Sequence, residues 1–538
     1  MKSSSLIDSL LEEQRNLPAA ARFAQRHDEH GFPAQQKFYR DLIPLDAPPP
    51  GHQYAFEVNL DLCSGCKACV TACHSLNGLD ETETWRSVGS LQGGDTVESF
   101  SQFITSSCHH CVDPACLSGC PTLAYEKDPR TGIVRHLDDQ CIGCQYCVMK
   151  CPYDVPQYHQ RKGIVRKCDL CSSRLAVGEA PACVQACPNE AIRITHVDQQ
   201  SIAAQFRELS SRNSFLPGAP GPDYTLPTTR YLSQKSSLDL LRPESGRRPL
   251  PSPAHPPLIA MLVLTQLSTG LSILDFLAHK FLPGKIPPAL LLADAGLAAV
   301  ALLAGLTSSV LHLGRPLQAW RSFLGLRRSW LSREIVVFGA FAAAAATQLY
   351  LEFQASLTAG AFSSLTCLLG LAGVFCSAML YHDTRREFWR LRKTAAQFFG
   401  TVLVLGSAGL ALQLSWHAPF QAYLSVASFF TLFAASTKLI LEFSLFNWPR
   451  PGLENSIHLL KSDLRGVLLL RAAAGLTGGV VLPLAIIVAQ VVCQTHSAGT
   501  LAALCLGSFL LCVTGELLER HLFFSAVAPS NFAGITHS

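Results

Sequence analysis

The first 250 residues of this 538-residue chain lack any apolar run near the ~20 residues that a helix needs to cross a bilayer. The N-terminus, MKSSSLIDSLLEEQRN, also lacks the apolar core of a secretory leader and a twin arginine, so we expect the soluble part to begin in the cytoplasm. The chain has little net charge, +4, whereas a nucleic-acid-binding domain is strongly basic. We therefore expect no nucleic-acid partner.

Long apolar runs begin only near residue 257, and each is close to the length of a membrane span. We predict an all-α bundle of eight transmembrane helices, with approximate bounds 257–278, 288–312, 333–352, 358–381, 397–415, 419–446, 466–492 and 499–522. An even number of spans returns the C-terminus to the side of the soluble domain. The chain is thus expected to be a multi-pass protein of the lipid bilayer.

Sixteen of the 21 cysteines lie between Cys63 and Cys187, in four motifs of close spacing. The third motif, CIGCQYCVMKCP, spaces three cysteines by two residues and adds a fourth before a proline, as in the bacterial ferredoxin run. A tetrahedral zinc site usually takes two separated pairs of cysteines instead. At four thiolates per cluster, the motifs predict four [4Fe-4S] clusters, which carry electrons. The expected iron ligands are Cys63, Cys66, Cys69, Cys73, Cys108, Cys111, Cys116, Cys120, Cys141, Cys144, Cys147, Cys151, Cys168, Cys171, Cys183 and Cys187.

Short β-like stretches lie beside the motifs: YAFEVNL before the first, GIVRHL before the third and AIRIT after the fourth. Strand, cluster loop, short helix and strand form a ferredoxin-like unit, and two such units use all four motifs. We therefore predict an α+β ferredoxin-like iron-sulfur domain followed by the all-α membrane bundle. The expected domains are 1–53, an N-terminal extension or strap; 54–212, the iron-sulfur domain; 213–256, a proline-rich linker; 257–525, the membrane-anchor domain; and 526–538, a C-terminal tail.

The charge of the loops predicts the orientation of the membrane domain. Loops on the side of the iron-sulfur domain hold thirteen Lys and Arg residues, and the opposite loops hold two, Lys280 and Lys285. The positive-inside rule then places the iron-sulfur domain on the cytoplasmic side of a bacterial inner membrane. A folded partner that carries an export signal would place it in the periplasm instead.

Two ionisable residues are expected near the membrane face of the iron-sulfur domain. His312 ends the second span in SSVLHLGRP, and Glu334 begins the third in LSREIVVF. A quinol loses two protons with its two electrons, and a histidine with a carboxylate can accept them, so both are candidate catalytic residues of a quinol site. The alternative is that His312 only lies at the interface and that the helix dipole favours Glu334.

Other polar residues inside the spans are explained without a role in catalysis. Ionisable groups in a bilayer are costly, and Lys438 and Glu442, four residues apart, are expected to pair on one helix face. No span offers two facing histidines at suitable depth, so we expect no haem.

The stretch from EVNLDLCSGCKACVTACHSLNGLDETETWR to ACPNEAI resembles the four-cluster iron-sulfur subunit of the dimethyl sulfoxide reductase family. The membrane half, with SSVLHLGRP, LSREI, YHDTRREFW and GELLERHLFF, is similar to the membrane-anchor subunit of that family. The likeness extends from about residue 54 to residue 525, as a fusion of two normally separate subunits.

The resemblance implies a nested pairing of the motifs. Three cysteines of one motif and the fourth of another are implied to bind the same cluster. The four implied ligand sets are Cys63, Cys66, Cys69 and Cys187; Cys168, Cys171, Cys183 and Cys73; Cys108, Cys111, Cys116 and Cys151; and Cys141, Cys144, Cys147 and Cys120. The resemblance also implies menaquinol oxidation near His312 and Glu334. A separate catalytic subunit is implied to carry molybdopterin guanine dinucleotide.

These observations predict the electron-transfer and membrane-anchor subunit of a molybdoenzyme of anaerobic respiration. In this interpretation the chain oxidises menaquinol and passes electrons through the clusters to the catalytic partner, which holds the terminal substrate site. One alternative keeps the architecture and reverses the flow, as the quinone-reducing subunit of a formate or sulfur-compound dehydrogenase. Another is a zinc-stapled membrane scaffold without a redox role.

Overall fold

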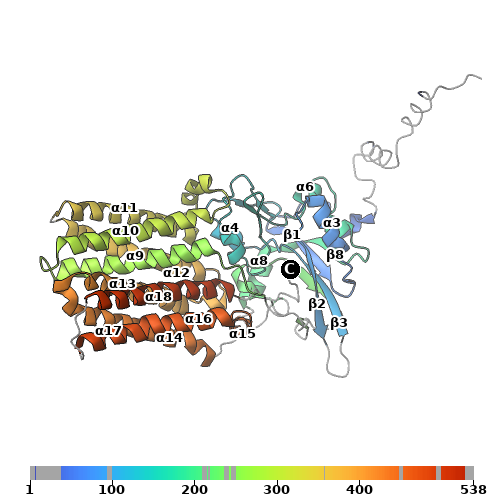
Figure 1. Cartoon of the computed structure of the whole chain (residues 1–538). Coiled ribbons are helices and arrows are strands. Elements are labelled where there is room, and N and C mark those ends of the chain that lie inside the picture. Colours follow the sequence, from blue (N-terminus) through green and yellow to red (C-terminus); the bar gives the residue numbers. More distant parts are fainter. Residues whose placement is uncertain are drawn as a thin grey trace, which may run out of the picture.

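The computed structural model describes residues 7, 29, 38–93, 100–208, 215, 219–234, 241–243, 250–356, 358–447, 452–491 and 498–527. Figure 1 shows an elongated molecule, with a bundle of long helices at one end and a smaller domain of strands and short helices at the other. This arrangement confirms the predicted fold class, an α+β domain followed by a helical bundle.

The central strand of the soluble domain is β1, His52–Asn59. It pairs antiparallel with β8, Ile192–Asp198, with Phe56 opposite Ile194, and parallel with β9, Arg230–Leu232. The first and last cysteine motifs are thus brought together, because they adjoin neighbouring strands. The strands predicted from YAFEVNL and AIRIT are confirmed as β1 and β8, and GIVRHL contains β5, Val134–His136.

Three further antiparallel pairs surround this sheet. A hairpin of β2 and β3 is extended by β10, and two small hairpins, β4–β5 and β6–β7, flank the third cysteine motif. Neither the β2–β3 hairpin nor β9 was predicted from the sequence. The bounds are Ser87–Gly93 for β2, Phe100–Ser106 for β3, Tyr125–Lys127 for β4, Gln157–His159 for β6, Ile164–Arg166 for β7 and Arg242–Pro243 for β10.

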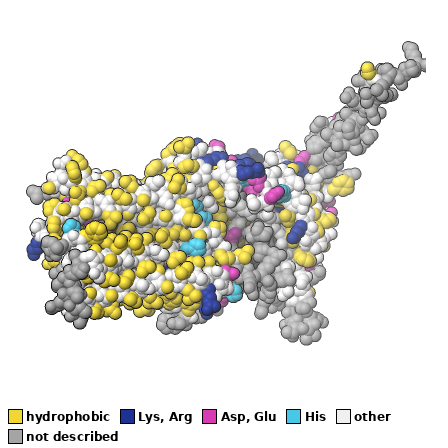
Figure 2. Space-filling model, in the orientation of Figure 1, with side chains coloured by type: hydrophobic (Ala, Val, Ile, Leu, Met, Phe, Trp, Pro, Cys, Tyr) yellow, Lys and Arg dark blue, Asp and Glu magenta, His cyan; other side chains and the backbone are white. Residues whose placement is uncertain are grey.

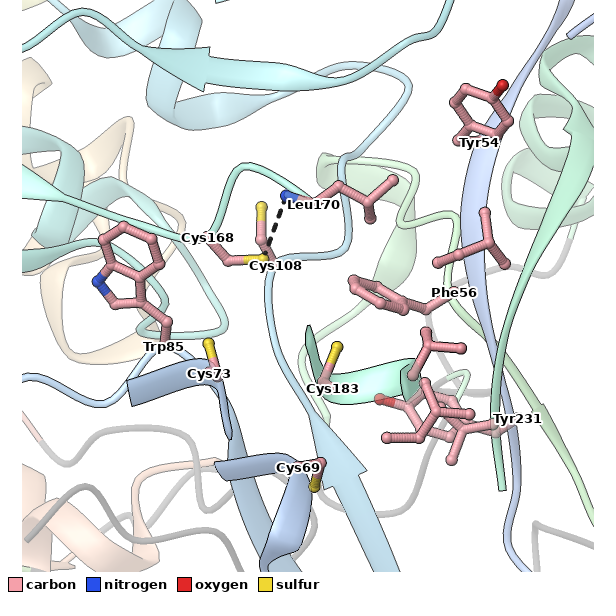
Figure 3. Close-up of a cluster of buried hydrophobic side chains, with 14 of the residues drawn as sticks. Tyr54, Phe56, Cys69, Cys73, Trp85, Cys108, Cys168, Leu170, Cys183 and Tyr231 are labelled. Atoms are coloured by element: carbon pink, nitrogen blue, oxygen red, sulfur yellow. Dashed lines mark hydrogen bonds between the residues drawn. The ribbon is translucent and has the colours of Figure 1, made fainter. Parts of the chain in front are cut away.

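Each cysteine motif contributes a short helix. The helices are α3, Ala68–Asn77; α4, Ala115–Gly119; α5, Tyr146–Lys150; α6, Ser172–Leu175; and α7, Ala182–Gln185. A further helix, α8, Gln199–Glu208, follows β8. The cysteines share their core with aromatic side chains, and Figure 3 shows Trp85, Phe56 and Tyr231 around five of the sulfur atoms.

Residues on both sides of the iron-sulfur domain pack onto it. Tyr39 and Leu42, from the predicted N-terminal extension, are buried in the core of the soluble domain. The predicted linker contributes β9 and β10, and it includes the buried Leu241. Most of residues 1–37, much of the predicted linker and the predicted tail from residue 528 lie outside the described residues.

Eight helices long and apolar enough to span a membrane are present in the described part of the chain, which confirms the predicted number. They are α9, Pro256–Phe281; α10, Pro288–Leu311; α11, Trp330–Phe353; α12, Ala359–His382; α13, Leu391–Ser415; α14, Leu424–Asn447; a seventh span of α16, Arg465–Leu476, and α17, Leu482–Val491; and α18, Ala498–Ser525.

Local sequence explains two details of the bundle. Between α16 and α17 the backbone forms a short π-helix at Thr477–Val481, two residues before Pro483, whose ring disturbs the preceding turn. Helices α9 and α13 pack closely at Gly270 and Gly406, where a Cβ on Gly270 would lie 2.4 Å from the Val402 carbonyl oxygen.

The surface of the bundle is apolar where it would face lipid. Figure 2 shows hydrophobic side chains over the visible face of the bundle, while charged side chains gather near the junction with the soluble domain. Leu303, Phe433 and Leu469 are among the large apolar side chains exposed there. Because the backbone hydrogen bonds are made within each helix, this surface is suited to the hydrocarbon core of a bilayer.

Candidate functional site

The structure brings cysteines of different motifs close together in the soluble domain, and we group the sixteen into four sets of four, following the pairing that the resemblance implies. The sets are defined here by their distance from the membrane bundle. The membrane-proximal set is Cys120, Cys141, Cys144 and Cys147; the second set is Cys108, Cys111, Cys116 and Cys151; the third set is Cys73, Cys168, Cys171 and Cys183; and the distal set is Cys63, Cys66, Cys69 and Cys187.

Cysteines of different sets that lie near one another give the order of the sets. Cys116 is close to Cys120, which joins the second set to the membrane-proximal set. Cys168 is close to Cys108, and Cys69 is close to Cys183, so the third and distal sets follow in turn. Figure 1 agrees with this order, since α4 lies beside the bundle and α3 lies at the far end of the soluble domain.

The donor sets fit iron-sulfur clusters. All twenty cysteines that the structure describes are free thiols, and a [4Fe-4S] cluster is held by four cysteine thiolates. Backbone N–H groups point at the sulfurs: Ala124 donates to Cys120 Sγ at 3.2 Å, and Leu170 donates to Cys168 Sγ at 3.4 Å (Figure 3). Such hydrogen bonds to sulfur stabilise the electron-rich form of a cluster and tune its potential.

Two buried cations, Lys167 and Arg86, lie among the sets. Lys167 Nζ is 3.7 Å from Cys108 Sγ and also donates to the carbonyl oxygen of Cys168 at 2.9 Å. Arg86 is fully buried, and its charge acts on cysteines of the third and distal sets. Arg86 stands outside every cysteine motif, so the motif spacing contained no signal for it.

The loop of the membrane-proximal set is pressed against the membrane domain. A Cβ on Gly314 would lie 2.2 Å from the Gly163 carbonyl oxygen, and a Cβ on Gly143 would lie 3.0 Å from Gly314 Cα. The Arg315 N–H donates to the Ile142 carbonyl oxygen at 3.1 Å. Glycine is needed at this junction because any side chain would separate the two backbones.

Polar side chains of the soluble domain also bind the membrane domain at this junction. Tyr146 donates to the Leu380 carbonyl oxygen at 3.0 Å, and Tyr224 donates to the Asp383 carbonyl oxygen at 2.7 Å. Lys150 pairs with the Asp383 carboxylate. The cluster domain is therefore held at a fixed position on the end of the bundle.

A cavity of about 300 Å³ lies at this junction. Its wall contains Cys144 of the membrane-proximal set together with both predicted quinol-site residues, His312 and Glu334. The remaining lining residues are mainly apolar and come from α5, α9, α10, α11 and α12, among them Met149, Met261, Leu306, Phe338 and Tyr381. The tertiary structure thus joins the predicted quinol-site residues to a cysteine set.

His312 and Glu334 present different polar groups to this region. His312 Nε2 is buried and has no hydrogen-bond partner among the described residues, and its ring lies 5.1 Å from that of His255. Burial, and then the His255 imidazole, lower the pKa of His312 to about 4, which favours the neutral ring. Glu334 is 4% exposed and accepts a hydrogen bond from Ser377 Oγ.

The predicted pair of Lys438 and Glu442 is part of a larger arrangement. Lys438 Nζ is 3.9 Å from Glu442, but it contacts Glu516 of α18 more closely and donates to Thr401 of α13 at 2.7 Å. The side chains of this buried ion network are Lys438, Glu442, Arg471, Glu516, Glu519 and Arg520. Its three cations and three carboxylates balance, so the network is internally compensated.

Four sets of thiolates in a line, fixed to the end of a membrane-spanning bundle, define an iron-sulfur electron-transfer protein of the membrane. The family described as "4Fe-4S dicluster domain" matches residues 99–197, and the family described as "DMSO reductase anchor subunit (DmsC)" matches residues 253–526. The chain belongs to the dimethyl sulfoxide reductase family, as a fusion of its iron-sulfur and membrane-anchor subunits.

Individual relatives match the soluble half. An anaerobic dimethyl sulfoxide reductase subunit of Escherichia coli K12 is 39% identical over 155 residues, which are 27% of this protein and 75% of the relative. "Thiosulfate reductase electron transfer subunit PhsB" of Salmonella typhi is 36% identical over 154 residues, 28% of this protein and 80% of the relative. "Hydrogenase-2 operon protein HybA" of Escherichia coli O157:H7 is 35% identical over 192 residues, which are 31% of this protein and 56% of the relative.

Proposed function

We propose that this chain oxidises menaquinol in the membrane and passes the electrons through four [4Fe-4S] clusters to a separate catalytic subunit. The observation that carries the proposal is the cavity whose wall contains Cys144, His312 and Glu334 together. A donor bound there lies against a ligand of the first cluster. Electron transfer then needs no large movement of the protein.

The chemistry of the cavity suits a quinol. Its lining is mainly apolar with a few polar groups, as expected for a site that takes an amphipathic ring from the bilayer. Oxidation breaks two O–H bonds and yields one quinone, two protons and two electrons. Nε2 of His312, which has no hydrogen-bond partner among the described residues, is a candidate acceptor for one quinol hydroxyl, and the Glu334 carboxylate is the second.

The line of cysteine sets supports the proposed route of the electrons. We assign one [4Fe-4S] cluster to each set, and electrons pass from the membrane-proximal set through the second and third sets to the distal set. The clusters supply one-electron carriers, and the chain supplies their ligands, spacing and hydrogen bonds. A two-electron donor is thereby connected to a partner through single-electron steps.

The distal set is the proposed exit toward the partner. Cys66 of this set is exposed, and the apolar side chains of Leu62 and Leu76 are exposed nearby in sequence. The partner is proposed to carry molybdopterin guanine dinucleotide and to bind the terminal substrate. The similarity to subunits of dimethyl sulfoxide and thiosulfate reductases supports such a partner.

The sidedness is also part of this proposal. Loops at the cluster end of the bundle carry most of the Lys and Arg residues, and the junction lies at that end. We propose that the iron-sulfur domain lies on the cytoplasmic side of a bacterial inner membrane. Export of a folded partner would reverse this assignment, and labelling of Lys280 from outside intact cells distinguishes the two orientations.

Substitution of Glu334 tests the quinol site. In the Glu334→Gln and His312→Gln variants, we expect reduction of the clusters by menaquinol to slow by about 100-fold, because a proton acceptor is lost. Stopped-flow absorbance of the purified complex measures this rate. Reduction by dithionite, which does not use the quinol site, measures how much reducible cluster each sample contains. The control is Glu387→Gln, since Glu387 lies in a loop at the same face and pairs with the exposed Arg390.

Normal quinol-driven reduction in both cavity variants would overturn the assignment of the site. Iron analysis of the same samples checks the clusters, with about sixteen irons per chain expected. A preparation with zinc in place of iron would instead favour the scaffold interpretation.

A further inference from the structure

A second group of buried ionisable side chains lies at the end of the bundle away from the iron-sulfur domain (Figure 1). It is formed by Asp275 and His279 near the end of α9, Glu352 at the end of α11 and Asp294 near the start of α10. Gln348, one turn before Glu352, donates to Asp275 Oδ2. The quinol cavity lies at the opposite ends of the same three helices.

The charges of this group are not balanced by protein cations. Asp275, Asp294 and Glu352 are 2%, 6% and 6% exposed, and within the described part of the chain their ion pairs involve only His279. A protonated His279 would compensate one carboxylate, because its Nε2 is 2.6 Å from Glu352 Oε1. Two buried carboxylates would still lack a positive partner among the described residues, and such burial is costly.

One carboxylate oxygen in the group has no hydrogen-bond partner among the described residues. Asp275 Oδ1 is buried without a hydrogen bond, and the atom nearest to pairing with it is His279 Nε2, at 3.8 Å. The other oxygen of the carboxylate, Oδ2, accepts a hydrogen bond from Gln348, which fixes the orientation of the Asp275 side chain. Asp275 therefore presents a free acceptor to the space next to His279 and Glu352.

The three groups have the spacing and the chemistry of metal ligands. One ligand atom from each of Asp275, His279 and Glu352 lies within 4.8 Å of the other two. Imidazole nitrogen and carboxylate oxygen at about 2.0–2.2 Å are ligands that zinc accepts, and a fourth position is then open to water. The hydrogen bond from Gln348 to Asp275 is the kind of outer contact that orients a metal-binding carboxylate.

We propose that Asp275, His279 and Glu352 bind a divalent metal ion of the zinc class. The ion ties the end of α9 to the end of α11 on the membrane face opposite the clusters, and its two charges compensate the carboxylates of Asp275 and Glu352. This site is separate from the quinol cavity and from the cysteine sets, and it does not depend on the proposed direction of electron flow.

The test uses the full chain purified with its partner in metal-free buffer and then equilibrated with zinc sulfate. We expect about one tightly held zinc per chain, and zinc K-edge absorption should show only nitrogen and oxygen ligands near ~2.0 Å. The Asp275→Asn and Glu352→Gln variants should each lose this zinc. Asp294→Asn is the matched control, because it removes a buried carboxylate of the same group that is not among the three ligand atoms, and it should retain the metal.

Absence of bound zinc in the wild-type chain, or its retention in both ligand variants, would overturn the site. Zinc bound through sulfur at about 2.3 Å would also overturn it, because the metal would then occupy the cysteine sets. Iron content and reduction of the clusters by quinol, measured on the same samples, report on the proposed function separately. They also show that each variant is folded.

Discussion

The two ends of helices α9, α10 and α11 carry similar residues in different arrangements. At the cluster end, His312 and Glu334 line a cavity of about 300 Å³ beside Cys144. At the opposite end, His279 Nε2 lies 2.6 Å from Glu352, and Asp275 is close by. An open space with separated polar groups accommodates an organic molecule, whereas converging ligand atoms accommodate an ion.

The buried ion network gives a third arrangement for comparison. Lys438 and Arg471 face Glu442 and Glu516 across α14, α16 and α18, so positive and negative charges are equal in number. Buried charged side chains therefore occur in two kinds of surroundings in this bundle. The network is compensated by its own side chains, whereas the Asp275 group is proposed to bind a cation from outside.

The largest effect is expected when the balanced network loses one cation. Lys438→Met leaves Glu516 without its closest partner, and we expect the free energy of unfolding to fall by about 3–5 kcal/mol. Denaturation of the detergent-purified chain, followed by helical circular dichroism, measures the change. The double variant Lys438→Met/Glu516→Gln should recover much of the loss, and equal stability of the single variant and the wild type would contradict the prediction.

The next effect concerns the cavity. Gly339 lines it, and a Cβ at this position meets open space, so Gly339→Leu should narrow the cavity without disturbing the helices. Because the quinol is displaced from its position, we expect cluster reduction by menaquinol to slow by about 100-fold while dithionite reduction is unchanged.

The matched control is Gly466→Leu, which also meets open space but lies in α16 outside the cavity. Its rate should equal that of the wild type. Equal rates in the two leucine variants would remove the cavity as the quinol site.

A smaller effect is expected at the junction between cluster loop and bundle. In Gly314→Ala the new methyl group would overlap the Gly163 carbonyl, where a Cβ lies at 2.2 Å. We expect a loss of about 1–3 kcal/mol and a slower first electron transfer, because the backbones must move apart. Rapid-mixing absorbance measures the rate. Gly466→Ala is the control, and an unaltered rate in Gly314→Ala would show that the close approach is not required.

The smallest effect is expected at the opposite end in the absence of metal. Asp275→Asn removes a buried charge whose one ion-pair partner among the described residues is His279, at 3.8 Å, so stability in chelator-treated buffer should stay within about 0.5 kcal/mol or rise. Thermal unfolding without and with zinc measures this. A marked loss of stability in metal-free buffer would show that the carboxylate is already compensated within the protein, in contrast to the interpretation given for this end.

The sequence predicted the local elements well where chemistry is repeated along the chain. The spacing of CIGCQYCVMKCP indicated cluster ligands, and the apolar runs indicated eight spans, because both signals lie within a few adjacent residues. Short β-branched stretches indicated β1 and β8 for the same reason. The β2–β3 hairpin and β9 were missed because their stability depends on partners distant in sequence.

For the candidate sites, the sequence by itself determined residue types and their order: sixteen cysteines, and a histidine and a carboxylate at neighbouring ends of two spans. Only the tertiary structure decided that Cys144 shares a cavity with His312 and Glu334, that Lys438 has its closest carboxylate on α18, and that Asp275 meets Glu352. Helix periodicity specifies neighbours three or four residues apart on one helix. Contacts between helices depend on packing of the whole bundle, which no local pattern encodes.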